Sequence, residues 1–235
     1  MAITGLVNRH ADPRLFVDMR TLTSPVLGIG ALVLFAATAC AGSSTATEPS
    51  IASPTADSVV GAHVYQSERF VTPLEVTVPA WLPAVPNAEE PNFLTWIGED
   101  ASFDRAVRFL VPVNVNQPGS AAATPPPDGY LSYLRGHVRY GAQLADETTT
   151  SVDGMPTTIV TATTAASLDG SLGCPAADVP APDCFGLQSG MALRLAVIEV
   201  ADKTLVAWAR VTEGSADAAE VFADFEQMLV SVQFR

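Results

Sequence analysis

Apolar and polar residues alternate along several stretches of the chain, a period-two pattern that is typical of strands with one buried face. Over residues 105–115 the apolar side chains occupy every second position, while Arg108, Pro112 and Asn114 fall on the other face. Because Pro112 has no N–H to donate to a neighbouring strand, we expect this strand to lie at a sheet edge or to contain a bulge. Shorter strands are predicted over two further ranges, 74–78 and 92–98.

Two hairpins are predicted further along the chain. The Asp-Gly pair at 153–154, a strong signal for a tight turn, separates the alternating stretches 143–151 and 155–164. Residues 191–200 and 204–212 form the second hairpin, and apolar residues fall on both of its faces. We therefore expect the second hairpin at the centre of the sheet, covered on both sides.

The C-terminal part of the chain predicts a helix that supplies one of these covers. It is expected to begin with Ser215 as its N-cap and to present a stripe of apolar residues at helical spacing, namely Val221, Phe222, Phe225, Met228, Leu229 and Val232. A shorter helix is expected from Asp128, as N-cap, to Gly136. The predicted fold class is α+β, an antiparallel sheet with the C-terminal amphipathic helix packed on one face.

The uncharged apolar run 26–39 is of a different kind. It has about 14 residues, whereas a membrane-spanning helix needs roughly 20. Arg20 precedes the run, and small residues lead directly to Cys40. The pattern predicts a signal peptide over residues 1–39, and the residues around Cys40 resemble the lipobox of bacterial lipoproteins, in which the cysteine is lipidated and becomes the first residue.

The same residues leave alternatives open. The chain is expected either to carry a lipid anchor at Cys40, on the outer face of the cytoplasmic membrane, or to be cleaved at an A-x-A site and secreted, or to retain the run as a membrane helix. A start at Met19 would give a compact signal peptide. Residues 40–62, rich in Ser, Thr, Ala and Pro, are predicted to be a flexible tether, and residues 63–235 a single globular domain.

Charge and cysteine content narrow the possible partners. The formal net charge is −13, from 12 Lys and Arg against 25 Asp and Glu. Nucleic acid is not expected as a partner, because phosphate binding requires clustered basic residues. With Cys40 lipidated, Cys174 and Cys184 remain to form a disulfide in an oxidising compartment. No metal or cofactor is expected, since two cysteines without a nearby histidine provide too few ligands.

No established catalytic motif occurs in the sequence, which lacks G-x-S-x-G, H-E-x-x-H, C-x-x-C and a glycine-rich phosphate loop. His137 is expected to be a solvated residue at a helix end. A carboxylate-based secreted hydrolase stays open, because a glycosidase needs only two acids at a suitable distance. Three adjacent acidic pairs are available for that chemistry: Glu89 with Glu90, Glu99 with Asp100, and Asp146 with Glu147.

Tryptophans are the remaining candidates for a binding site. Trp81 and Trp96 occur among prolines and are candidates to line an apolar or sugar-binding cleft. Trp208 lies in the hairpin that is expected to be covered on both faces, so we expect it to pack in the core.

The order of these segments resembles that of uncharacterised actinobacterial lipoproteins and secreted domains, whose layout is similar to the PsbP-like fold. The resemblance covers roughly residues 70–235 and rests on the phrases VPAW, GYLSYLRGH, GCP to DC, and FEQMLVSVQFR. It implies a non-catalytic accessory module of the envelope that binds a small or lipidic ligand or an envelope protein. A secreted hydrolase and a purely structural envelope component are the alternatives.

We predict that labelled palmitate is incorporated into the chain in bacterial cells and that Cys40→Ala abolishes this label, because Cys40 supplies the acylated sulfur. Ser43→Ala, which leaves the cleavage sequence intact, is the matched control and retains the label. An unlabelled chain recovered from the culture medium would contradict the anchor and favour secretion.

Overall fold

The computed structural model describes residues 61–98, 104–120 and 122–235. The predicted signal peptide over 1–39, the predicted lipidation site Cys40 and nearly all of the predicted tether lie outside these residues. Within the described ranges, no helix has both the length and the apolar character needed to cross a membrane.

Seven antiparallel strands form the main sheet, which makes the fold broadly α+β and mostly β. In spatial order they are β3 (Ala88–Glu90), β4 (Phe93–Ile97), β5 (Ala106–Leu110), β13 (Lys203–Thr212), β12 (Met191–Val200), β9 (Met155–Thr164) and β8 (Ala142–Val152). The hairpin of β12 and β13 lies at the centre of this order, as its two apolar faces predicted.

Smaller sheets and short helices complete the described part of the chain. One sheet has the order β1 (His63–Gln66), β2 (Leu74–Val78) and β14 (Gln233–Phe234), and the two-stranded sheets pair β10 (Leu168–Gly173) with β11 (Phe185–Leu187) and β6 (Val115–Asn116) with β7 (Ala123–Thr124). The helices are α1 (Tyr130–Arg135), α2 (Ala218–Val230) and the 3-10 helices η1 (Gly136–Tyr140) and η2 (Ala181–Asp183).

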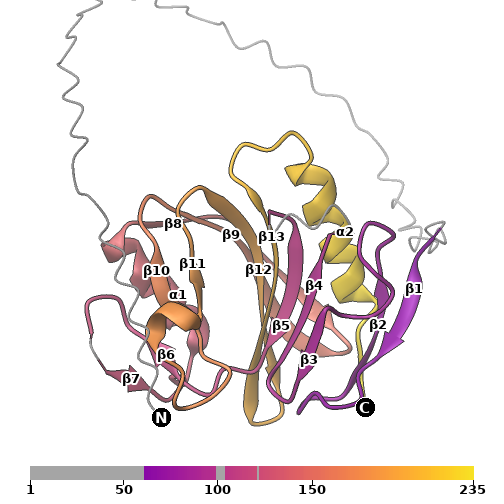
Figure 1. Cartoon of the computed structure of the whole chain (residues 1–235), viewed down its shortest axis with the longest axis horizontal. Coiled ribbons are helices and arrows are strands. Elements are labelled where there is room, and N and C mark those ends of the chain that lie inside the picture. The colour runs from indigo at the N-terminus through magenta and orange to yellow at the C-terminus, as the bar shows by residue number, and fades with distance from the viewer. Residues whose placement is uncertain (1–60, 99–103, 121) are drawn as a thin grey trace, which may run out of the picture. The chain divides into compact units, whose positions relative to one another are not determined.

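Each face of the central hairpin is buried in its own hydrophobic core. Ala196 and Ile198 of β12 belong to the core under α2 and the β1-β2-β14 sheet, and α2 crosses that side of the main sheet in Figure 1. Leu195 and Val197 belong to the second core, which also contains residues of α1 and β10. Alternate residues of β12 therefore pack into two different cores, as expected for a strand covered on both sides.

An arginine fastens α2 to the sheet. Arg194 of β12 is almost fully buried, and its Nε donates to Glu226 of α2 at 2.6 Å. Its guanidinium also donates to the Asp146 carbonyl oxygen at 2.9 Å and to the Thr161 hydroxyl at 3.0 Å. This buried cation is therefore paired and hydrogen-bonded, and these contacts offset the free energy lost when a charge is removed from water.

Several local predictions are confirmed. Strands form at β2, β4 and both predicted hairpins, and the turn at Asp153 and Gly154 has φ values of 47° and 79°. Both residues lie in the left-handed region that a two-residue type I′ turn requires. Four members of the predicted apolar stripe on α2 are buried within the helix: Val221, Phe225, Met228 and Leu229.

The prediction for residues 105–115 is wrong in two respects. The strand ends at Leu110, and it lies between β4 and β13 rather than at an edge. Pro112 lies beyond the strand end, where it interrupts no ladder. The chain then turns to the disulfide loop, and the Val113 N–H donates to the Cys174 carbonyl at 2.9 Å.

The two predicted N-caps are also wrong. Helix α2 begins at Ala218 with Asp217 as its N-cap, and the Ser215 hydroxyl donates to the Asp217 carboxylate instead of to the helix. Helix α1 has Gly129 as its N-cap with φ at 72°, so Asp128 lies one residue too early. A left-handed residue is easiest for glycine, which explains the shift.

We predict that Phe225→Ala lowers the free energy of unfolding by about 3–5 kcal/mol, because the side chain is fully buried between α2 and the sheet. Val230→Ala on the same helix, where the valine is 67% exposed, is expected to change it by less than about 0.5 kcal/mol. Denaturant unfolding measures both. Equal effects would contradict the assignment of the buried face.

Candidate functional site

A pocket of about 150 Å³ lies on the face of the main sheet opposite α2, and two arginines from adjacent strands line it. We call it the arginine pocket. Its lining residues are Arg108, Asp183, Cys184, Phe185, Gly186, Gln188, Leu193, Trp208 and Arg210.

Strand register places the two arginines beside each other. Arg108 of β5 pairs with Trp208 of β13, and Arg210 follows Trp208 by two residues. Because side chains alternate between the faces of a strand, Arg108, Trp208 and Arg210 all project from the same face. Leu193 of β12 is the partner of Arg210 on the other side and continues this surface.

The disulfide loop forms the opposite wall of the pocket. Cys174 and Cys184 are bridged, as the cysteine count predicted, and this bridge is compatible with an extracytoplasmic protein. Cys184 itself lines the pocket. Gly186 packs so closely on β10 that a Cβ would lie 2.2 Å from the Leu168 carbonyl oxygen. Only glycine permits this approach, which brings β11, with its first residue Phe185, over the sheet.

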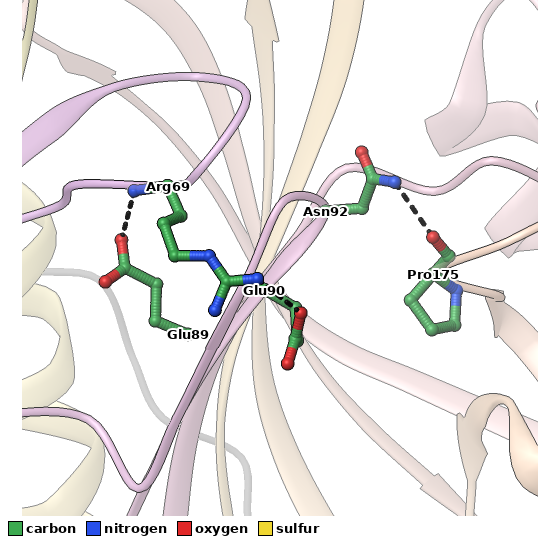
Figure 2. A network of polar contacts seen from close by, with 5 residues as sticks. All are labelled: Arg69, Glu89, Glu90, Asn92 and Pro175. Atoms are coloured by element: carbon green, nitrogen blue, oxygen red, sulfur yellow. Dashed lines mark hydrogen bonds and ion pairs between the residues drawn. The ribbon is translucent and has the colours of Figure 1, made fainter.

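Side-chain amides tie the same loop to the strands. Asn92, in the turn between β3 and β4, donates through its Nδ2 to the Pro175 carbonyl at 2.9 Å (Figure 2). Glu90, just before that turn, forms an ion pair with Arg69 at 3.2 Å, and Glu89 accepts the Arg69 N–H at 2.8 Å. One turn therefore fixes the disulfide loop and the segment that precedes β2.

The guanidinium groups of the arginine pocket have few partners. Arg108 lies over the Phe185 ring, with 5.4 Å from its Cζ to the centroid, and Arg210 donates to Gln188 at 3.1 Å. The Nε atoms of both arginines are buried without a hydrogen-bond partner. Among the described residues no carboxylate lies within 4.0 Å of either guanidinium, although the exposed Asp183 lines the same pocket.

Electrostatics act against the two positive charges of this arrangement. Burial, together with the positive charge of Arg210, lowers the pKa of Arg108 to about 10. Burial also lowers the pKa of Arg210, while the negative charge of Asp104 acts in the opposite direction. A buried cation is normally stabilised by an opposite charge. What the site can do chemically is therefore to bind an anion through charge-assisted hydrogen bonds.

The tryptophans that the sequence singled out lie elsewhere. Trp96 is fully buried and makes edge contacts with the rings of Tyr65 and Phe109. Trp81 is partly buried, and its Nε1 donates to Asp224 of α2 at 3.0 Å. Neither indole lines the arginine pocket. Trp208, which was expected to pack in the core, is 2% exposed and does so while also forming the pocket floor.

His137 is buried, so the expectation of a solvated histidine is wrong. Its Nδ1 lies 2.9 Å from the Tyr133 carbonyl, which only accepts hydrogen bonds, and burial lowers its pKa. It lines a second pocket, of about 310 Å³, whose one cation, Arg139, stacks on Tyr140. That second pocket lacks the paired charges of the arginine pocket, which we therefore take as the candidate site.

The described acidic pairs make contacts with the chain itself. Burial acts to raise the pKa of Glu89, but hydrogen bonds from the Arg69 N–H and the Tyr65 hydroxyl outweigh it and lower the pKa. Glu147 forms an ion pair with Arg135. The third pair, at 99–100, lies outside the described residues.

Comparisons with known proteins give similarities of fold. No family model matches the chain, and no curated protein sequence matches it. The solution structure of cyanobacterial PsbP (CyanoP) from Synechocystis sp. PCC 6803 has 11% identity and a TM-score of 0.41, covering 79% of this chain and 99% of its own. The Saccharomyces cerevisiae Ran-binding protein Mog1p has 11% identity and a TM-score of 0.40, covering 73% and 95%.

A structure from Bacteroides thetaiotaomicron VPI-5482 has 7% identity and a TM-score of 0.35 over 73% of this chain. The chain spans about half the length of that protein, 49%. A PsbP protein, the type of layout that the sequence resembles, is thus among the similar structures. At these identities the similarity concerns the fold alone.

We predict that Arg108→Met raises the free energy of unfolding of the anion-free protein by about 1 kcal/mol, because it removes a half-buried cation that has no ion-pair partner among the described residues. The lost contact with Phe185, about 0.5–1 kcal/mol, offsets only part of this gain. Denaturant unfolding at low ionic strength, without phosphate or sulfate, measures the change.

Arg194→Met is the matched control, a buried arginine on the other face of the sheet that is fully paired. It is expected to lower the free energy of unfolding by about 2 kcal/mol, because its hydrogen bonds are lost. Destabilisation of both variants to the same extent would show that Arg108 is not under electrostatic strain.

Proposed function

We propose that the chain is an exported protein, anchored through a lipid on Cys40 to the outer face of the cytoplasmic membrane, that binds a small anion in the arginine pocket. In this role it acts as a non-catalytic accessory module of the envelope. The observation that carries the proposal is the pair of the half-buried Arg108 and the buried Arg210, whose Nε atoms are both buried without a hydrogen-bond partner and which have no carboxylate partner among the described residues.

The composition of the chain makes this pair unusual. The protein has 25 acidic residues against 12 basic ones, so carboxylates are plentiful as partners. Arg69, Arg135 and Arg194 all form ion pairs with glutamates. The two arginines of the pocket instead keep donors free toward a cavity, which is the arrangement expected of a binding site.

Export is supported by separate features of the sequence and the fold. The uncharged run 26–39 and the small residues before Cys40 are typical of a processed leader. The bridge between Cys174 and Cys184 is typical of oxidising compartments. The leader sequence does not depend on the arginine pocket, so the location and the binding activity are tested separately.

We predict that the full chain, purified from the envelope of cells that express it and examined by native mass spectrometry, carries a small anionic molecule. Arg108→Met and Arg210→Met are expected to lose this adduct, because each removes half of the positive charge of the pocket. Arg139→Met, an exposed arginine beside Tyr140, is the control that retains it. A folded wild-type chain that neither copurifies with an anion nor binds an added one would overturn the proposal.

A further inference from the structure

The charge of the arginine pocket indicates the valence of its ligand. Arg108 and Arg210 place two positive charges on one wall, and the charge of Arg210 is among the causes that lower the pKa of Arg108. Asp104 partly offsets the charge of Arg210 but does not line the pocket, so a single negative charge inside the pocket would leave one guanidinium without an opposite charge there. Asp183 at the exposed edge forms no ion pair with either of them among the described contacts. Compensation of both cations inside the pocket requires a ligand with two negative charges.

The geometry of the donors favours oxygens that point in several directions. Arg108 extends from β5, and its guanidinium lies over the Phe185 ring. Arg210 extends from β13, and its guanidinium donates to Gln188. They therefore approach the pocket from two strands and have different neighbours. A carboxylate presents two oxygens in one plane, whereas phosphate and sulfate groups present three or more around a tetrahedral centre. A tetrahedral group can accept from both guanidinium groups at once.

The size of the pocket limits what accompanies this group. A volume of about 150 Å³ matches a cavity that holds a single benzene ring. It admits a phosphate or sulfate group with a few further atoms, and any larger part of a ligand would lie outside it. Leu193 and Trp208 supply an apolar floor for those few atoms.

We infer that the arginine pocket selects a divalent tetrahedral oxyanion, a phosphate monoester or sulfate group, over a monovalent carboxylate. This inference rests on the proposed function, because it specifies the ligand of the same pocket. The group can belong to a soluble molecule or to the headgroup of a lipid such as phosphatidic acid.

Isothermal titration of the full chain tests the inference with sulfate, glycerol 3-phosphate and acetate at constant ionic strength. At pH 8 we expect sulfate and glycerol 3-phosphate to bind about tenfold more tightly than acetate, a difference of about 1.4 kcal/mol. At pH 5 the phosphate monoester is mostly monovalent, because its second pKa is about 6, so its affinity is expected to fall while that of sulfate is unchanged.

Variants separate this inference from the proposed function. Arg210→Met leaves one cation and is expected to remove the preference for sulfate over acetate, while Arg139→Met preserves it. Acetate that binds wild type as tightly as sulfate would overturn the divalent assignment and leave anion binding intact. A folded chain that binds none of the three anions would overturn both.

Vesicles of phosphatidylcholine, with or without phosphatidic acid, distinguish the source of the group. Binding to phosphatidic acid that Arg108→Met abolishes identifies a lipid headgroup, and binding of glycerol 3-phosphate alone identifies a soluble ester. Either result supports the inference. Vesicle binding that is unchanged in both Arg108→Met and Arg210→Met, without any binding of glycerol 3-phosphate or sulfate, would overturn it.

Discussion

Burial of both faces of the central hairpin is the constraint on which the other elements depend. β12 and β13 have apolar residues on each side, and a fully buried Leu or Ile contributes roughly 1.5–3 kcal/mol relative to an exposed one. Neither face can be left to solvent. Helix α2 and the β1-β2-β14 sheet cover one face, and α1 with β10 and β11 covers the other, so the chain forms three layers around one hairpin.

Because both faces of the hairpin are buried, a charged residue in these strands needs hydrogen-bond or ion-pair partners. Arg194 has such partners on the α2 side, because Glu226, Asp146 and Thr161 accept its hydrogen bonds. On the other side Arg108 and Arg210 are not matched in this way. A net charge of −13 repels large polyanions at long range, but at physiological salt exposed charges interact over only about 8 Å. A small anion at the arginine pocket would therefore interact mainly with Arg108 and Arg210, and little with the distant acidic residues.

Much of the main sheet could be predicted, because the apolar periodicity of the hairpins and of α2 is a local property of the sequence. The alternation over 105–115 predicted a strand that is too long, because the alternation continues past Leu110 whereas the pairing with neighbouring strands ends there. Strands β10 and β11 were missed because Gly170, Gly173 and Gly186 interrupt any apolar pattern. These glycines are required by positive φ or by close approach, which sequence periodicity does not reveal.

The arginine pocket could not be predicted, because it depends on the pairing of Arg108 with Trp208, which lie about a hundred residues apart. A usable signal was present all the same. Arg210 falls within a strand that was expected to be covered on both faces, where a cation needs a partner. A charged residue in a doubly covered strand is thus a reason to look for a binding site.

The disulfide determines when the wall of the arginine pocket is complete. Cys184 belongs to the pocket wall, and its bond to Cys174 closes only where thiols are oxidised. Before oxidation that wall is held by noncovalent contacts alone, among them the hydrogen bonds of Asn92 and Asn114. Completion of the wall thus depends on formation of the disulfide. A chain in which Cys174 and Cys184 are still reduced has therefore not yet completed the wall of the arginine pocket.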